Sequence, residues 1–259
     1  MSRSLKYDVP GEDPRISMTS VATAGWPPRP APDALGQAAE GVATDPPQPG
    51  WDRMVLEIGF GRGEFLLDLS TRTPGTFFVG IEISFKRTLK MARKVARAGL
   101  RNVRLLEGRA EVALRQLFDP GQLSEIWINF SDPWPKARHA HRRVIQQSFV
   151  GDAASRLAPG GTLFVATDDV PYAHQIDEVL SGEKTLCNRY APWPFLPEVE
   201  GRMETGYEAQ WRAEGRPLHF FAYGRPEGRP EGRPACQPEG SLGPLEGRGD
   251  DRPIGTGSR

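Results

Sequence analysis

Residues 54–64 read MVLEIGFGRGE, and this stretch decides the fold. The apolar run Met54–Ile58 ends at glycines, and Glu64–Ser70 follows with apolar side chains at helical spacing. Glycine allows a sharp turn and a close approach of the backbone to a ligand. The stretch therefore predicts a buried strand, a glycine loop and a helix, which together open an α/β domain.

The rest of the core repeats this alternation of strand and helix. Further strands are expected at Phe77–Ile81, Val103–Leu106, Glu125–Phe130, Thr162–Ala166 and Pro217–Tyr223. Helices are expected at Ser84–Ala98, Arg142–Leu157 and Tyr172–Leu180. The pattern predicts an α/β fold with a doubly wound, mostly parallel, Rossmann-like sheet. Ligands of such sheets bind at the carboxyl ends of the strands, so the informative residues should follow the strands.

The two ends of the chain differ in composition from this core. Of the 25 prolines in 259 residues, nine fall in residues 1–52, which have no sustained apolar period. Residues 224–259 hold nine glycines, six prolines and a repeated GRPE unit. Such segments bury too little apolar surface to fold. We expect a mostly disordered extension at 1–52, one domain at 53–223 and a low-complexity, disordered tail at 224–259.

Composition also excludes several classes of protein. Two cysteines are too few for a disulfide framework or a four-thiolate zinc site, and no metal site is expected. No apolar run approaches the roughly 18 residues of a membrane-spanning helix. The polar residues Met1–Pro14 lack the apolar segment of a secretory signal, so a cytoplasmic location is expected.

Positive charge is clustered although the formal net charge is +0. Lys86–Arg109 contains nine Lys or Arg and a single acid, and Lys136–Arg143 adds four more with two histidines. A local positive potential, rather than the net charge, attracts a polyanion. A solvated helix face explains the first cluster equally well, so charge alone leaves a nucleic-acid partner open.

The glycine loop separates two classes of cofactor. Gly59, Gly61 and Gly63 lack the spacing of a dinucleotide fingerprint. Glu57 would repel a pyrophosphate and attract a cation, and S-adenosylmethionine carries a sulfonium and an ammonium but no phosphate. Glu82, at the end of the second strand, can accept from both ribose hydroxyls. The pattern favours a methyltransferase over a dinucleotide enzyme, with a plain βα turn as the structural alternative.

The most specific segment is residues 129–136, which read NFSDPWPK. Two prolines stiffen the loop that holds Asp132 at the carboxyl edge of the sheet. Trp134 beside Lys136 and further basic residues suits recognition of RNA loops and phosphates. A rigid turn with a surface charge run is the plain alternative.

These motifs together resemble those of the bacterial tRNA (guanine-N7-)-methyltransferases, which are class I S-adenosylmethionine-dependent enzymes. The resemblance covers about Val55–Tyr223. It rests on Leu56–Gly63, Gly80–Glu82, Phe130–Lys136 with Arg138 and His139, Ala166–Asp168 with Tyr172, and Thr205–Glu208. It implies transfer of a methyl group from S-adenosylmethionine to N7 of the guanine at position 46, in the variable loop of tRNA. A tRNA partner is implied, and no membrane or obligatory protein partner is inferred.

The resemblance also implies roles for individual residues. Cofactor-binding residues would be Glu57, Gly59, Gly61, Gly63, Glu82, Arg109, Ala110 and Asp132. Asp132 would also be the catalytic residue. Residues that hold the tRNA guanosine would be Lys136, Asp168, Thr205, Gly206, Tyr207 and Glu208.

Three features depart from the family pattern. Arg109 stands where an acidic residue usually precedes the alanine at position 110, so a carboxylate contact to the adenine amine is absent. Gly206 and Tyr207 replace the usual Lys and Phe, which removes one phosphate contact. The basic segment that usually precedes the first strand is not found in residues 1–52.

Methylation at guanine N7 needs no general base, because N7 has an in-plane lone pair and no proton to lose. Asp132 would orient the base through its N1–H and 2-amino donors and stabilise the developing positive charge. Two alternatives stay open. One is an amino-methyltransferase acting on another nucleobase, and the other is a non-catalytic tRNA-binding protein that keeps the fold, as Arg109 and Gly206 suggest.

Overall fold

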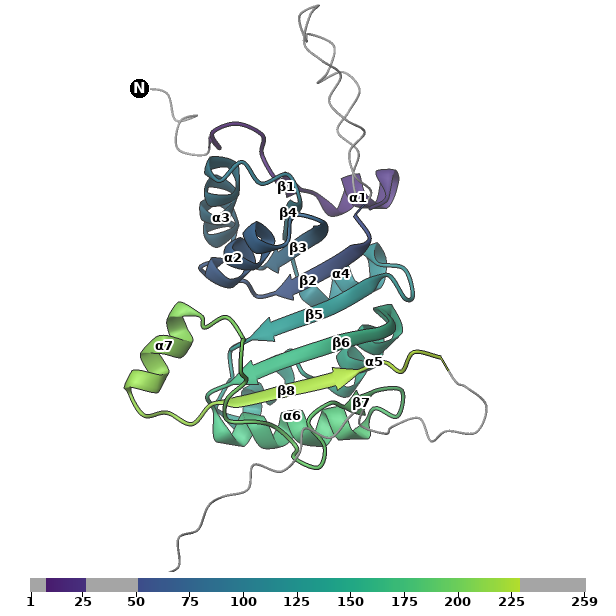
Figure 1. Ribbon diagram of the computed structural model, residues 1–259, viewed down its shortest axis with the longest axis vertical. Coiled ribbons are helices and arrows are strands. Elements are labelled where there is room, and N and C mark those ends of the chain that lie inside the picture. Colours follow the sequence, from purple (N-terminus) through teal and green to yellow (C-terminus); the bar gives the residue numbers. More distant parts are fainter. Residues whose placement is uncertain (1–7, 27–50, 229–259) are drawn as a thin grey trace, which may run out of the picture.

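A central sheet runs through the protein, with helices on both of its faces (Figure 1). The computed structural model describes residues 8–26 and 51–228. Their strands are β1 (Arg15–Ile16), β2 (Arg53–Ile58), β3 (Thr76–Glu82), β4 (Val103–Glu107), β5 (Leu123–Asn129), β6 (Leu157–Thr167), β7 (Cys187–Asn188) and β8 (His219–Gly224). Their helices are α1 (Met18–Ala24), α2 (Glu64–Arg72), α3 (Phe85–Arg97), α4 (Ala110–Leu117), α5 (Gln147–Arg156), α6 (Val170–Gly182) and α7 (Gly206–Ala213), with a 3-10 helix at Ala137–Arg142.

The strands lie in the order β1-β4-β3-β2-β5-β6-β8-β7. Strand β2 pairs in parallel with both β3 and β5, whereas β8 runs antiparallel to β6 and β7. The chain leaves β2 on one side and returns on its other side as β5, so the strand order reverses there. The expected doubly wound, mostly parallel, Rossmann-like sheet is confirmed, and the reversal defines the edge where a ligand should bind.

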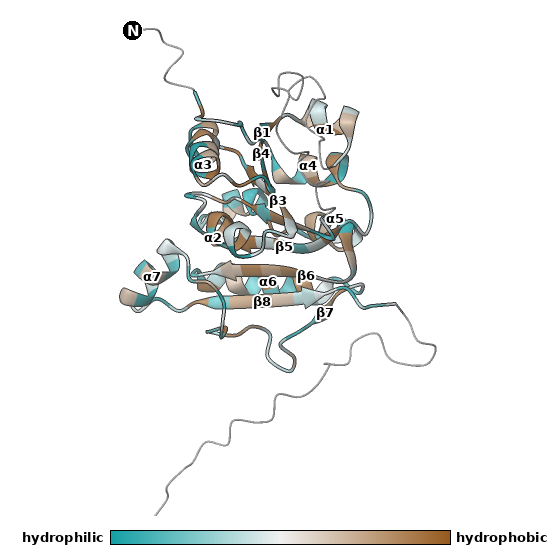
Figure 2. Ribbon diagram, turned by 45° about the horizontal axis from the view of Figure 1, so that its top comes forward, coloured by the Kyte–Doolittle hydropathy of each residue, from teal (hydrophilic) through white to brown (hydrophobic). Residues whose placement is uncertain are grey.

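Two apolar layers hold the helices to the sheet. On one face, Phe78 and Leu105 pack with Leu66 of α2 and Met91 of α3. On the other face, Ile128 belongs to a larger cluster that includes side chains of α1, α4, α5 and α6. Figure 2 shows α3 with polar residues on one side and apolar residues on the other. No helix in the described ranges is long and apolar enough to cross a membrane.

The N-terminal segment is ordered over residues 8–26, so the expectation of a mostly disordered extension is wrong for that part. Strand β1 forms one edge of the sheet and pairs in parallel with β4, and α1 packs against α4. Trp26 stacks on Phe118 with the ring centroids 5.2 Å apart. A capping box between Ser17 and Ser20 starts α1. The pairing gives hydrogen-bond partners to the outer side of β4, which would otherwise be the edge of the sheet. The sequence pattern did not predict strand β1. The expectation for residues 1–7 and 27–50 lies outside the described residues.

Helix α5 begins at Gln147, five residues after the expected start. Residues Ala137–Arg142 form a 3-10 helix instead, and Arg143 then has a ψ of 136°. Its guanidinium donates to the carbonyl of Pro133 at 2.6 Å. Arg143 therefore anchors the loop that contains Pro133 and is not part of the helix. Strand β6 begins at Leu157, five residues before the expected Thr162, and includes Pro159–Gly161.

The C-terminal limit of the domain lies beyond the expected residue 223. Gly224 belongs to β8, and Arg225 exchanges backbone hydrogen bonds with Gly160 and Gly161 at 2.9 and 2.8 Å. The sheet therefore continues into the segment that was expected to be disordered. Residues 229–259 lie outside the described part of the chain. Helices α4 and α7 and strand β7 were not expected, because each is short, with eight residues in either helix and two in the strand.

Candidate functional site

A cavity of about 220 Å³ lies where β2 and β5 end. Its walls come from the glycine loop after β2, from Asn129 at the end of β5 with Phe130 and Asp132 after it, and from Thr205 and the first turns of α7. Segments that are far apart in the sequence therefore meet at the edge where the strand order reverses. This is the place that the topology assigns to a ligand.

The glycine loop needs its glycines for conformation and for space. Gly61 and Gly63 have φ values of +54° and +72°, which side chains strongly disfavour. A Cβ on Gly63 would lie 2.2 Å from Sδ of Met91 in α3. The loop consequently packs directly against α3 and leaves its outer side to the cavity.

Glu82 is buried at the end of β3 and is held by two backbone donors. Oε2 accepts from the N–H of Gly61 at 3.1 Å, and Oε1 accepts from the N–H of Ser84 at 3.0 Å. The N–H of Gly108 donates to the Glu82 carbonyl at 3.1 Å. The carboxylate is therefore fixed between the glycine loop and the start of α3, where it can receive further hydroxyl donors.

Glu57 is only 3% exposed, and its side chain makes few hydrogen bonds. Oε1 accepts weakly from Nδ2 of Asn129 at 3.4 Å, and Oε2 has no hydrogen-bond partner among the described residues. Burial raises the pKa of Glu57 to about 8, although Asn129 and Arg202 oppose the rise and Glu82 adds to it. A buried carboxylate oxygen without a donor fits a cationic ligand group such as an ammonium.

Asp132 sits on a strained and well-anchored loop at the mouth of the cavity. Phe130 and Trp134, on either side of it, have φ values of +53° and +43°, which are rare outside glycine. The Phe130 N–H donates to the Ala166 carbonyl at 2.8 Å, and Arg143 holds Pro133. The surrounding bonds thus hold an exposed carboxylate in one place.

Trp134 packs against the basic segment and does not line the cavity. The guanidinium of Arg142 lies 4.9 Å from the centre of its ring, and His139 meets it edge-on at 5.8 Å. The aromatic side chain therefore organises the cationic surface that contains Lys136. Lys136 itself is exposed and outside the cavity.

About half of the residues predicted from the sequence line the cavity. Glu57, Gly59, Gly61, Gly63, Asp132, Thr205 and Tyr207 line the cavity, and Glu82 lies behind its glycine wall. Arg109, Ala110, Lys136, Asp168, Gly206 and Glu208 do not line it. Asp168 accepts from Arg216 at 3.1 Å, and Arg109 is exposed, 3.7 Å from Glu111. The N–H of Gly206 donates to Glu64 at 3.2 Å, and a Cβ on Gly206 would meet that carboxylate at 2.5 Å.

Sequence reasoning missed a buried polar network beside the cavity. Arg202 donates to Oδ1 of Asn129 at 2.7 Å and forms an ion pair with Glu208. Arg212 pairs with the other oxygen of Glu208 at 3.1 Å. Both oxygens of Glu208 are thus engaged within the protein, and its predicted role toward guanosine stays a prediction. No local pattern marks Arg202, because 73 residues separate it from Asn129.

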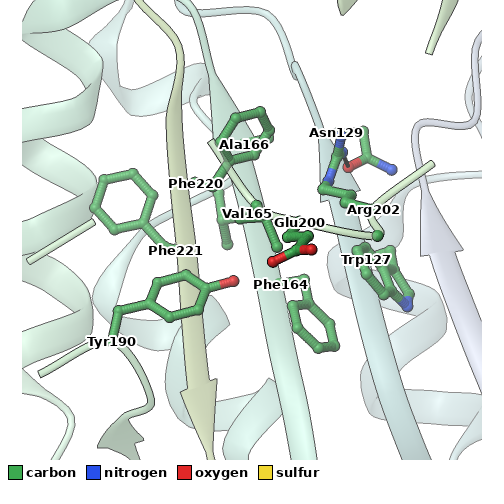
Figure 3. A pocket seen from close by; sticks show the side chains of 12 residues that line it. Trp127, Asn129, Phe164, Val165, Ala166, Tyr190, Glu200, Arg202, Phe220 and Phe221 are labelled. Carbon is green, nitrogen blue, oxygen red and sulfur yellow. Dashed lines mark hydrogen bonds between the residues drawn. The ribbon is translucent and has the colours of Figure 1, made fainter. Parts of the chain in front are cut away.

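A second cavity, of about 230 Å³, is lined by two members of this network, Asn129 and Arg202 (Figure 3). Asn129 lines both cavities, and Arg202 lines the second one. The stacked rings of Trp127 and Phe164, 3.9 Å apart, form part of its wall. Within the described residues, no group of three or more His, Cys, Asp or Glu could hold a metal ion.

The chain matches the family model Methyltransf_4, described as "Putative methyltransferase", over residues 52–221. A tRNA (guanine-N(7)-)-methyltransferase of Geobacter metallireducens is 33% identical over 170 residues, 66% of this chain and 81% of that protein. One of Thermus thermophilus is 37% identical over 170 residues, 66% of this chain and 53% of that protein. The chain thus spans about half the length of the Thermus relative.

Among solved structures, the antibiotic-resistance methyltransferase Kmr matches with a TM-score of 0.48 and 20% identity, over 70% of this chain and 90% of that one. The described sheet, with an acidic glycine loop where its strand order reverses, defines an α/β protein of the Rossmann-like class. The chain belongs to the Methyltransf_4 family and, within it, to the tRNA (guanine-N(7)-)-methyltransferases.

Proposed function

We propose that this protein transfers a methyl group from S-adenosylmethionine to N7 of a guanine in tRNA, the variable-loop guanine at position 46. The observation that carries the proposal is the unpartnered, buried Oε2 of Glu57 beside a glycine loop, in a chain of this family. A carboxylate in that position suits a cofactor that presents an ammonium. The cytoplasm, where tRNA is available, is the proposed place of action.

Different residues of the cavity bind different groups of the cofactor. Glu57 accepts from the ammonium, and Glu82 accepts from the ribose hydroxyls while the Gly61 N–H keeps it in place. The backbone of Gly59–Gly63 forms the wall against which the cofactor lies. When bound, S-adenosylmethionine supplies an electrophilic methyl group. Ala110, at the start of α4, offers its backbone N–H to the adenine, and Arg109 offers no carboxylate there.

The residues at the mouth of the cavity orient the guanine. Asp132 accepts from N1–H and the 2-amino group, which selects guanine over adenine and directs N7 into the cavity. The same carboxylate stabilises the positive charge that develops on the purine ring. Thr205 and Tyr207 form the opposite wall, and Lys136 with its basic neighbours contacts phosphates. Holding both reactants in place provides a large part of the rate, since no proton must be removed.

The proposal is tested with the purified full chain, labelled S-adenosylmethionine and a tRNA transcript, followed by nucleoside analysis. Label at N7 of guanosine is the expected result, and a transcript with adenine at position 46 should remain unlabelled. Label on an exocyclic nitrogen would favour an amino-methyltransferase. Binding of tRNA without any label would favour a non-catalytic RNA-binding protein. Either of these outcomes would overturn the proposal.

A further inference from the structure

Helix α7 forms one wall of the cavity, yet the side chain that it buries against the rest of the protein is charged. Glu208 is the residue of α7 that is buried, and the apolar side chains of this helix are not. Trp211 is partly buried, against Phe130 at 4.8 Å between ring centroids. A short helix of eight residues with so little apolar burial is not held in place by packing alone.

The partner of that charge is Arg202, which lies in the segment before α7. Its side chain is 6% exposed, and that of Glu208 is 4% exposed. The guanidinium also lies 4.7 Å from the centre of the Phe220 ring, on β8. Arginine presents several donors in a rigid plane, so one side chain can bond two acceptors and rest on an aromatic face at once.

The second acceptor of Arg202 is Oδ1 of Asn129, at the end of β5, at 2.7 Å. The amide nitrogen of Asn129 faces the carboxylate of Glu57, and so the contacts run from Glu57 through Asn129 and Arg202 to Glu208. The second cavity lies beside Arg202 and Asn129, so free space remains on that side (Figure 3). Polar bonds, more than close packing, therefore decide where Arg202 lies.

We propose that Arg202 is a positioning residue, which fixes α7 over the cavity by joining Glu208 to Asn129. Thr205 and Tyr207 are placed by this contact, because Thr205 caps α7 through the Glu208 N–H at 3.1 Å. The same guanidinium orients the amide of Asn129 toward Glu57. The inference rests on the proposed function for its role in methyl transfer, whereas its structural part is independent of that function.

The main test variant replaces both members of the pair, as Arg202→Met with Glu208→Met. Removing one charge alone would leave the other buried and unpaired, whereas apolar replacement of a whole pair is often tolerated by the fold. Arg202→Lys keeps the charge but loses the planar guanidinium, whose separate nitrogens reach Glu208 and Asn129. Arg212→Gln breaks a bond to the same carboxylate at 3.1 Å and leaves the link to Asn129 intact. Arg115→Gln removes a remote surface pair with Asp152 as a control.

Two measurements are made on each folded variant. Amide hydrogen exchange of residues 206–213 in the free protein measures how firmly α7 is held against the domain. This measurement does not depend on enzymatic activity. In the double variant exchange in α7 should become about tenfold faster or more, while exchange in β5 is unchanged. Steady-state kinetics with tRNA should show kcat/KM lower by about a hundredfold, with KM for tRNA raised. Arg202→Lys should recover part of both properties, Arg212→Gln should change them less, and Arg115→Gln should match the unaltered protein.

Unchanged exchange in α7 together with unchanged kcat/KM in the folded double variant would overturn the inference. If the double variant does not fold, Arg202→Lys decides the question by the same two measurements. If the unaltered protein methylates no tRNA, the proposed function fails, and the exchange of α7 still decides whether Arg202 holds the helix.

Discussion

The backbone N–H of Gly61 donates to Oε2 of Glu82 at 3.1 Å, which ties the glycine loop after β2 to the end of β3. The other oxygen of the same carboxylate accepts from Ser84 at the start of α3. One buried acid thus joins two successive βα turns of the sheet. The loop that faces the cofactor is therefore shaped before any ligand arrives, which lowers the cost of ordering it on binding.

Glu82→Gln is expected to weaken binding of S-adenosylhomocysteine by about tenfold to a hundredfold, because an amide offers one acceptor where the carboxylate offers two. The free protein should lose about 1–2 kcal/mol of unfolding free energy for the same reason. Calorimetry and urea denaturation measure the two effects. Equal affinity in the variant and the unaltered protein would show that Glu82 does not hold the ribose.

Binding of S-adenosylhomocysteine at pH 7 should release about one proton from Glu57. The pKa of this buried carboxyl is raised to about 8, so it is mostly protonated in the free protein at pH 7. A bound ammonium favours the ionised form and drives the proton off. Calorimetry in buffers of different ionisation enthalpy measures the release. The Glu57→Gln variant should release none, and an equal release from both proteins would contradict this role.

Glu57 should also make stability depend on pH. The folded protein holds this proton more tightly than the unfolded chain, in which the pKa is near its ordinary value of 4.5. Its contribution to stability is therefore fully present below pH 4.5 and is lost as the pH rises toward about 8. Glu57→Gln should raise Tm at pH 9 relative to the unaltered protein, and should do so less at pH 5. Parallel Tm profiles for the two proteins would argue against a buried, protonated Glu57.

Asp132→Asn should lower the single-turnover rate of methyl transfer by about a hundredfold or more, since the lost charge no longer stabilises the purine cation. Binding of S-adenosylhomocysteine should change little. Rapid-quench assays with saturating tRNA measure the rate. Asp152→Asn, on the far surface where it pairs with Arg115, is the matched control. A normal rate in Asp132→Asn would remove this residue from the mechanism.

Gly63→Ala should destabilise the protein more than Gly121→Ala. Both glycines have positive φ, +72° and +75°, so each substitution carries about 1–2 kcal/mol of backbone strain. A Cβ on Gly63 also meets Met91 at 2.2 Å, whereas nothing lies within 4 Å of one on Gly121. Urea denaturation of both variants isolates the cost of the clash. Equal losses of unfolding free energy would mean that Met91 of α3 moves away from the new side chain at no cost.

Much of the sheet could be predicted because its pattern is local. Buried runs such as Phe77–Ile81 are continuous in the sequence, and the glycines after Ile58 mark the turn that follows. The edge strand of the sheet and the ends of the helices were harder to predict. Strand β1 has two residues, and only its pairing with β4 makes it a strand. The start of α5 depends on Arg143, which bonds Pro133 ten residues earlier.

The sequence by itself determined the alternation of the central strands with helices, the acidic glycine loop and the stiff Asp132 segment, because each depends on neighbours along the chain. The tertiary structure alone decided what surrounds them. Gly206 meets Glu64 across 142 positions, and Arg202 meets Asn129 across 73. Such contacts depend on how separate elements pack, and no periodicity or spacing encodes them. The unpartnered oxygen of Glu57 likewise follows from burial, which a glutamate in a sequence does not disclose.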